Sequence, residues 1–288
     1  MAKIDVNGLT LDYEFVGDEG AAPLVLTPGG RYPRDTAGAP ELAEKLAEGG
    51  FRVLLWDRPG CGASDIAFTA PSESVMNAEA LTGLVRALDL RDVTLAGGSA
   101  GSRISLMAAA RMPENIRKMA IWWISGGPVG LAGLAWFYCG DQIAAASKGG
   151  MEAVAQLPSW ADQISRNPKI RDILLAQDAD EYIATMQKWG KAFAYSDDSP
   201  VPGMTEADFA KLTMPVMTFR SGKSDMAHTR ETSEWVHRLL PNSTMVEPPW
   251  GDQEWNYVST FPIDIEKRRG RFERWPLLAP MLLDFLKD

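Results

Sequence analysis

Short apolar runs alternate with amphipathic stretches along most of the chain. From Lys3 to Val16, apolar and polar residues alternate one by one around Asn7-Gly8, which predicts a β-hairpin. Buried strands are then predicted at Leu24–Leu26, at Phe51–Trp56, from Val93 onward and at Lys118–Ile124. The helices predicted between them are Glu41–Ala47, Asn77–Leu90 and Ser102–Met112. This alternation implies a mostly parallel sheet, with ligands bound at the carboxyl ends of its strands.

The alternation stops at Val129 and resumes after residue 205. Residues 129–195 contain no convincing strand, and we expect several helices there, with breaks at Gly149-Gly150, Pro158 and Pro168. The composition of residues 196–203 is that of a linker. The later predicted elements are a strand at Pro215–Phe219, a helix at Thr229–Leu240, a short strand at Met245–Val246 and a helix at Trp275–Leu286. We therefore predict an α/β core of residues 1–128 and 206–288, interrupted by a helical insertion over residues 129–205.

The sequence Gly97-Gly98-Ser99-Ala100-Gly101 matches the G-x-S-x-G pattern. An apolar run precedes it and a helical segment follows, which is the strand–turn–helix context that gives the pattern meaning. Such a turn would hold Ser99 in a strained backbone conformation, while Gly97 and Gly101 would let the strand and the helix approach closely. The N-terminus of the helix would direct free N–H groups at whatever Ser99 attacks. The pattern predicts that Ser99 is a nucleophile.

Composition narrows the range of partners. The chain has 288 residues, 45% of them hydrophobic and 23% charged, as in an ordinary soluble protein. A net charge of −9 argues against nucleic acids and anionic membranes as partners. The sequence shows no signal-peptide pattern, and two cysteines, Cys61 and Cys139, do not indicate a disulfide framework. We expect a cytoplasmic protein without metal or other cofactor that acts on a small molecule, with homodimer formation left open.

Together these features resemble the α/β-hydrolase superfamily with an inserted helical lid. The resemblance covers nearly the whole chain. It rests on the order of elements, the Ser99 turn, the glycine-rich turn Thr27–Arg31, the turn Asp57–Ser64 and the helical insertion. Trp56–Gly62 and the Ser99 turn are most similar to those of proline iminopeptidases and related lid-bearing hydrolases. The resemblance implies a mostly parallel central sheet flanked by helices, with an all-helical lid.

The resemblance also implies an oxyanion hole built from backbone N–H groups. One donor would be Ala100, the residue after the nucleophile, and the other would be Gly29 or Gly30. Glycine permits the close approach to the substrate that such a donor needs. The loop departs from the family in one respect, since it begins with Thr27-Pro28 where family members usually have His-Gly.

The general base is where the sequence departs most from the family. Asp225 stands where the family places its acid, after the strand that follows the lid. The family's histidine follows the last strand, but Asp252 stands at about that position and no histidine is near it. The chain has two histidines in all. His228 comes three residues after Asp225, whereas His237 lies within a predicted helix.

Three accounts are therefore open. In the first, which we favour, His228 is the base, Asp225 or Asp252 orients it, and Ser99 attacks a small hydrophobic ester, lactone or similar carbonyl compound. In the second, no triad exists, and Asp252 or His228 is the general acid or base of a lyase, isomerase or cyclase. In the third, the site is catalytically dead and binds a ligand only. The resemblance adds a proline iminopeptidase-like peptidase as a further alternative.

Several residues are candidates for contacts with the substrate. Trp122, Trp123 and Trp250 fall near the predicted active-site loops and Trp136 falls in the insertion, which favours an apolar pocket. Arg31, beside the expected oxyanion loop, is a candidate partner for a substrate carboxylate. Cys61 in the neighbouring turn is expected to be a small buried side chain rather than a reactive thiol.

Overall fold

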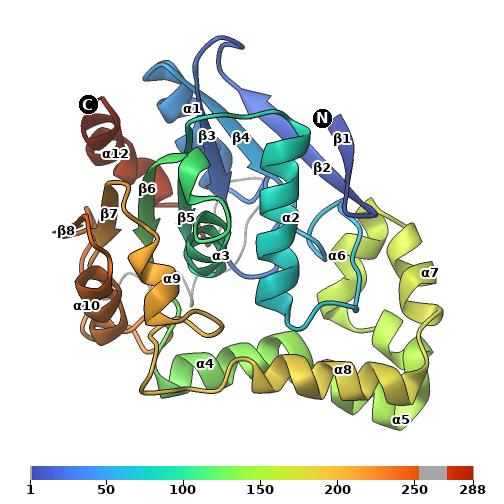
Figure 1. Cartoon of the computed structure of the whole chain (residues 1–288). Coiled ribbons are helices and arrows are strands. Elements are labelled where there is room, and N and C mark those ends of the chain that lie inside the picture. Colours follow the sequence, from blue (N-terminus) through green and yellow to red (C-terminus); the bar gives the residue numbers. More distant parts are fainter. Residues whose placement is uncertain (1, 253–270, 288) are drawn as a thin grey trace.

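The computed structural model describes residues 2–252 and 271–287, and an eight-stranded sheet lies at the centre of this part of the chain (Figure 1). Its strand order is β1-β2-β4-β3-β5-β6-β7-β8. The first two pairs, β1·β2 and β2·β4, are antiparallel, and the pairs from β4 to β8 are parallel, as predicted. The strands are β1 (Ala2–Val6), β2 (Leu9–Val16), β3 (Ala22–Thr27), β4 (Phe51–Trp56), β5 (Val93–Gly98), β6 (Ile116–Trp122), β7 (Val216–Phe219) and β8 (Ser243–Val246).

Helices cover both faces of the sheet, each over its own apolar core. One face carries α1 (Ala39–Glu48), the 3₁₀-helix η3 (Trp275–Leu278) and α12 (Ala279–Leu286). The other face carries α2 (Glu73–Ala87), α3 (Ala100–Ala109), α9 (Glu206–Ala210) and α10 (Arg230–Leu239). A short 3₁₀-helix, η1 (Pro113–Asn115), leads into β6. In the described ranges, no helix combines the length and the apolar character needed to cross a membrane.

Helix α2 begins four residues earlier than its apolar pattern predicts. Its N-cap is Ser72, whose hydroxyl accepts the N–H of Val75 at 3.2 Å. The first turn is polar yet buried, because the Glu73 carboxylate pairs with Arg103 of α3 at 3.1 Å. Apolar periodicity did not reveal this turn, since two of its buried side chains, Glu73 and Ser74, are charged or polar.

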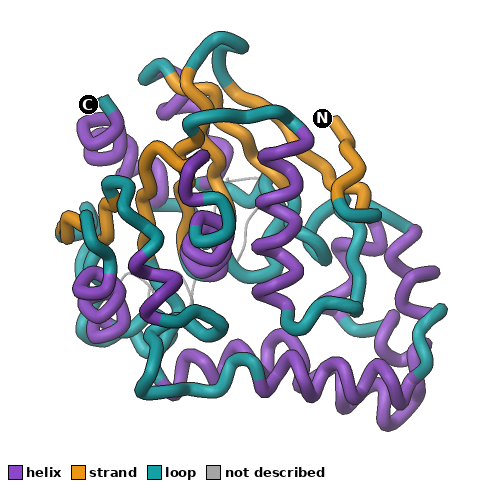
Figure 2. The backbone as a smooth tube through the Cα atoms, in the orientation of Figure 1, coloured by secondary structure: helices purple, strands orange, loops and turns teal. Residues whose placement is uncertain are grey.

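The segment between β6 and α9 is helical and contains no strand in the part described here, as predicted (Figure 2). Its elements are α4 (Pro128–Ala135), the π-helix η2 (Trp136–Gly140), α5 (Asp141–Ala155), α6 (Pro158–Arg166), α7 (Lys169–Leu175) and α8 (Ala179–Lys191). Non-helical backbone interrupts α5 at Gly149 and Gly150, and α6 begins at Pro158. The insertion has an apolar core of its own around Trp160 and Trp189. The division into domains at residues 128/129 and 205/206 stays a prediction.

Both cysteines are buried free thiols, and we expect neither to react in the folded protein. Burial raises the pKa of the Cys61 thiol, and it raises that of Cys139 to about 12. Because the thiolate is the reactive species, iodoacetamide at about pH 8 should leave the native protein unmodified. Mass spectrometry should find two adducts only after denaturation. Rapid native alkylation of Cys61 would contradict the inert role expected for it.

Candidate active site

Ser99 lies at the tight turn between β5 and α3. Its backbone angles, φ 57° and ψ −121°, fall at a positive φ that residues with a side chain rarely adopt. The turn requires glycine on both sides of the serine. A β-carbon at Gly97 would lie 2.8 Å from the carbonyl carbon of Gly101, and one at Gly101 would lie 2.0 Å from the carbonyl oxygen of Thr27. The structure thus contains the strained strand–turn–helix arrangement that the sequence pattern predicts.

A histidine ring lies within hydrogen-bond distance of the Ser99 hydroxyl. His228 Nε2 is 2.9 Å from Ser99 Oγ, and His228 Nδ1 is 3.1 Å from Oδ2 of Asp225. All three residues are buried: Ser99 is 8% exposed, His228 2% and Asp225 6%. Hydroxyl, imidazole and carboxylate therefore form one continuous line of polar contacts, shielded from bulk water.

The turn after β7 fixes the histidine and the aspartate together. Asp225 Oδ1 accepts the backbone N–H groups of Ala227 at 3.0 Å and of His228 at 2.9 Å, so Oδ2 is directed at the ring. The next residue, Thr229, caps α10 by accepting the N–H of Thr232 at 3.2 Å. The Trp123 ring stacks beside the imidazole, with 6.0 Å between ring centroids and 22° between planes. The turn after β7 therefore orients the carboxylate toward the ring, and the Trp123 ring packs beside the imidazole.

Asp252 makes a different set of contacts. Its Oδ1 accepts the N–H of Lys223, and its Oδ2 lies 3.3 Å from the hydroxyl of Ser224. Asp252 thus braces the start of the loop that carries Asp225, and the carboxylate beside the His228 ring is that of Asp225. The second histidine, His237, bonds through Nδ1 to the hydroxyl of Ser243 at 2.9 Å.

The glycine loop after β3 lies against the nucleophile. A β-carbon at Gly29 would be 2.8 Å from Ser99 Cβ and 3.4 Å from Ser99 Oγ, and Gly30 has a φ of 51°. Among the residues that the structure places, the N–H groups of Gly29, Gly30 and Ala100 donate to no protein acceptor. Three backbone donors are therefore available on the loop and the helix start that border Ser99.

The comparison with protein families covers the Ser99 turn and the glycine loop, whereas Asp225 and His228 lie outside the matched region. The model of a family described as alpha/beta hydrolase fold matches residues 23–122, from β3 to the end of β6. The chain has the α/β-hydrolase fold. The fold predicted from the sequence is thereby confirmed.

Curated relatives match the chain over different spans. Serine hydrolase BPHL from human is 26% identical over 253 residues, which cover 87% of this chain and 79% of the human protein. The mouse protein of that name is 38% identical over 128 residues, or 42% of each chain. A 2-hydroxy-6-oxononadienedioate/2-hydroxy-6-oxononatrienedioate hydrolase 1 from Pseudomonas putida is 31% identical over 124 residues, or 43% of each chain. The two latter matches thus span less than half of the relatives' length.

A solved structure shares the fold over the full length of both chains. The enol-lactonase from Burkholderia xenovorans LB400 superimposes with a TM-score of 0.63 at 21% sequence identity, and the match covers 100% of each chain.

The four tryptophans named from the sequence as candidate substrate contacts occupy different environments in the structure. Trp122 is fully buried and packs edge-on against Trp275, with ring centroids 4.9 Å apart, so its role is core packing. Trp123 faces the His228 ring, and Trp250 lies 5.5 Å from Trp123 between ring centroids. Trp136 is 63% exposed on η2. Contacts of Trp123, Trp136 and Trp250 with substrate stay predictions.

Arg31 contacts the helical insertion. Its Nη2 donates to the carbonyl of Tyr138 at 3.0 Å, and its guanidinium lies 4.7 Å from the ring centre of Trp160. These contacts tie the oxyanion loop to the insertion and use part of the side chain that was expected to meet a carboxylate. The substrate contact of Arg31 stays a prediction.

Sequence reasoning did not find Ser125 or the role of Arg58. Ser125 follows β6, and its buried hydroxyl lies 3.5 Å from Ser99 Oγ. Its place at the carboxyl end of the strand beside β5 was the signal that could have found it. Arg58 donates through Nη2 to the carbonyls of Gly29 and Gly30. No pattern in the sequence indicates the direction of that side chain.

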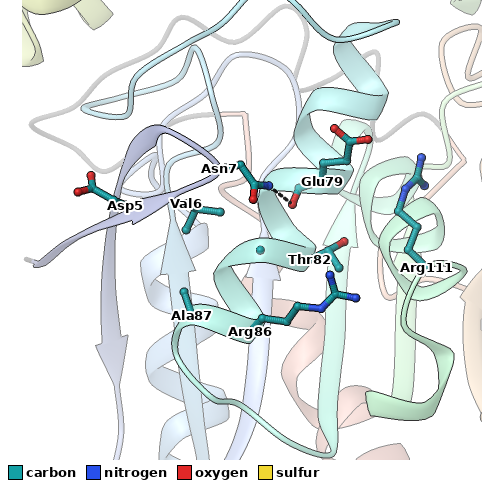
Figure 3. Close-up of a pocket in the computed structure, with 9 residues that line it drawn as sticks. Asp5, Val6, Asn7, Glu79, Thr82, Arg86, Ala87 and Arg111 are labelled. Atoms are coloured by element: carbon teal, nitrogen blue, oxygen red, sulfur yellow. Dashed lines mark hydrogen bonds between the residues drawn. The ribbon is translucent and has the colours of Figure 1, made fainter.

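A groove of about 600 Å³ lies away from Ser99, between the N-terminal hairpin and α2 (Figure 3). Its lining mixes charges of both signs: Asp5, Val6, Asn7, Glu79, Thr82, Gly83, Arg86, Ala87 and Arg111. It shares no residue with the Ser99, Asp225 and His228 loops, so we place the candidate chemistry at the carboxyl edge of the sheet.

Proposed function

We propose that this α/β-hydrolase cleaves a small apolar ester, lactone or similar carbonyl compound through nucleophilic attack by Ser99. The observation that carries the proposal is the 2.9 Å separation of Ser99 Oγ from His228 Nε2. A serine hydroxyl is a weak nucleophile unless a base accepts its proton. The imidazole is in hydrogen-bond reach of that proton, although it comes from an unusual place in the chain.

Each side chain then has a defined step. As Oγ bonds to the substrate carbonyl carbon, its proton moves to His228 Nε2, and the carbonyl oxygen becomes an oxyanion. Collapse of this intermediate expels the alcohol oxygen, which takes the proton from Nε2 and leaves an acyl-Ser99. Water then attacks the acyl group with His228 as base, which releases the acid. Asp225 accepts the Nδ1–H throughout and stabilises the imidazolium.

The surroundings favour hydrolysis over the alternatives. Backbone donors from Ala100 and the glycine loop border the nucleophile, where an oxyanion would form. Trp123 and Trp250 lie beside the base, which favours an apolar acyl or alcohol group. The names of the human and Pseudomonas relatives, a serine hydrolase and a dioate hydrolase, also support a hydrolytic reaction. The helices from α4 to α8 would act as the lid over this site.

A substrate panel tests the proposal. We expect turnover of a short-chain p-nitrophenyl ester and of an aliphatic lactone, with little turnover of a prolyl p-nitroanilide. A fluorophosphonate probe should also label Ser99 stoichiometrically. Turnover confined to the prolyl amide would replace the proposal by an aminopeptidase. If there is neither turnover nor labelling, but ligands still raise the melting temperature, the chain would be a binding protein.

The close approach of Gly29 to Ser99 gives a second test. Gly29→Ala would place a methyl group 2.8 Å from Ser99 Cβ and displace the nucleophile or the loop. Because small misplacements of reacting groups cost rate steeply, we expect kcat/KM for the ester to fall about 100-fold. Gly20→Ala is the matched control, since nothing lies within 4 Å of its new methyl group. Equal rates for both variants would contradict the placement of this loop at the reacting centre.

A further inference from the structure

The turn after β4 carries a buried arginine that faces the glycine loop. Arg58 is 1% exposed, and its Nη2 donates to the carbonyl of Gly29 at 3.2 Å and to that of Gly30. The turn itself is organised by Asp57, whose carboxylate accepts the N–H groups of Arg34 at 2.7 Å and Ala63 at 2.9 Å. The turn that the sequence singled out therefore presents one guanidinium to two neighbouring peptide groups of the loop.

These bonds determine which way the peptide groups face. The described backbone contains no cis peptide bond, and the C=O and N–H of a trans peptide point to opposite sides. The Gly29 carbonyl and the Gly30 N–H belong to the same peptide. That carbonyl accepts both Arg58 Nη2 and, at 3.3 Å, the N–H of Tyr32, so the Gly30 N–H points to the opposite side of the peptide. The Gly30 carbonyl fixes the next peptide in the same way.

The direction away from Arg58 is available for an oxyanion. The Gly30 N–H donates to no protein acceptor among the residues described, and the loop touches the Ser99 side chain through Gly29. A guanidinium on the carbonyl also polarises the peptide, which makes its N–H a stronger donor. A buried positive charge behind the peptide further favours negative charge in front of it.

Acidic and basic side chains of α2 and α3 lie on the side of the Arg58 guanidinium that faces away from the glycine loop. Its Nη1 lies 4.0 Å from Oε1 of Glu73 in α2, and the other oxygen of Glu73 pairs with Arg103 of α3 at 3.1 Å. Arg103 also donates from Nε to the hydroxyl of Ser74 at 2.9 Å. The guanidinium of Arg58 therefore has charged support on the side opposite to the loop.

We propose that Arg58 is a positioning residue that fixes the Gly30 N–H, rather than that of Gly29, as the second oxyanion donor. This inference rests on the proposed hydrolysis at Ser99. It extends that function by assigning the choice between the two glycines to a residue of the neighbouring turn.

The test compares Arg58→Met with Arg103→Met. Both replace a buried arginine that contacts Glu73, so both are expected to lower the melting temperature. Activity is normalised to the fraction of active sites titrated with a fluorophosphonate, which removes the contribution of unfolded protein. Since loss of one oxyanion donor costs about 100- to 1000-fold and Arg58 only positions it, we expect kcat per active site to fall about 10- to 100-fold in Arg58→Met. KM should stay close to that of the wild type.

A boronic acid provides a readout that a merely structural role would not move. It forms a tetrahedral adduct on the serine hydroxyl, with a boron-bound oxygen in the oxyanion position. Its inhibition constant should rise in Arg58→Met by the same factor as kcat falls, and should rise far less in Arg103→Met, which keeps the Arg58 bonds to the two carbonyls. Arg58→Lys keeps a cationic donor and should recover part of both quantities. If Arg58→Met does not fold, Arg58→Lys provides the test of the assignment instead.

Two results would overturn the assignment. In the first, both Arg58→Met and Arg58→Lys match the wild type in kcat per active site and in boronic acid inhibition. This result would show that Arg58 does not position an oxyanion donor, while the proposed function would stay intact. A wild-type protein that neither hydrolyses esters nor titrates with the fluorophosphonate would remove the proposed function and this inference together.

Discussion

Replacing Ser99 with alanine is expected to abolish ester hydrolysis and fluorophosphonate labelling. The substitution removes the hydroxyl proposed to form the acyl-enzyme, so kcat should fall on the order of 10⁴- to 10⁶-fold, to the residual rate that binding and the oxyanion donors supply. Stopped assays with p-nitrophenyl esters and intact-mass measurement of the labelled protein check this. The alanine side chain is compatible with the packing around residue 99, so the melting temperature should change little.

The alanine variant also separates catalysis from binding. It should still bind a slowly hydrolysed ester analogue, detected as a rise in melting temperature with ligand concentration. If Ser99→Ala retained more than about a tenth of the wild-type rate, water attack assisted by His228 would be the mechanism instead, and the acyl-enzyme would be excluded.

Replacing His228 with alanine is the second large effect. Because its Nε2 is 2.9 Å from Ser99 Oγ, the variant loses the proton acceptor, and we expect kcat to fall on the order of 10⁴- to 10⁶-fold. Labelling of Ser99 by the fluorophosphonate should slow correspondingly. Steady-state kinetics and labelling time courses measure both quantities.

The chain offers a matched control in its other histidine. His237 lies on α10, and its Nδ1 makes a hydrogen bond with Ser243 at the start of β8. No contact with Ser99 is seen for it, so His237→Ala should keep the wild-type rate within about threefold. A wild-type rate in His228→Ala would disprove the role of the imidazole. The carboxylates would then have to be considered as bases, as in the account without a triad.

Local patterns were sufficient to predict the frame of the molecule and the residues on tight turns. The Ser99 turn could be predicted because glycine spacing, an apolar strand and a helix all coincide within a few residues. His228 could be predicted as the candidate base because it lies three residues after Asp225, in a loop at the carboxyl edge of the sheet. Both inferences depend on contacts between residues that are close in sequence.

Contacts between distant segments could not be predicted in this way. Arg58 contacts the carbonyl of Gly29, which lies 29 positions earlier in the chain. Ser125, after β6, contacts Ser99, after β5, although the two are 26 positions apart. The sequence also left Asp225 and Asp252 as alternative partners of the His228 ring, because no sequence pattern indicates which of two loop carboxylates contacts an imidazole. The early start of α2 was missed for the same reason, since the buried Glu73 carboxylate pairs with Arg103 of α3, which is 30 positions away.

Asp225 and His228 come from one turn, and this has a consequence for the evolution and engineering of the site. In the usual arrangement of this superfamily, acid and base sit on separate loops, and their spacing depends on how two strands are aligned. Here four consecutive residues contain the pair and the backbone N–H groups that orient the carboxylate. If this turn were grafted after the equivalent strand of a related scaffold, the geometry between the carboxylate and the imidazole would be transferred with it.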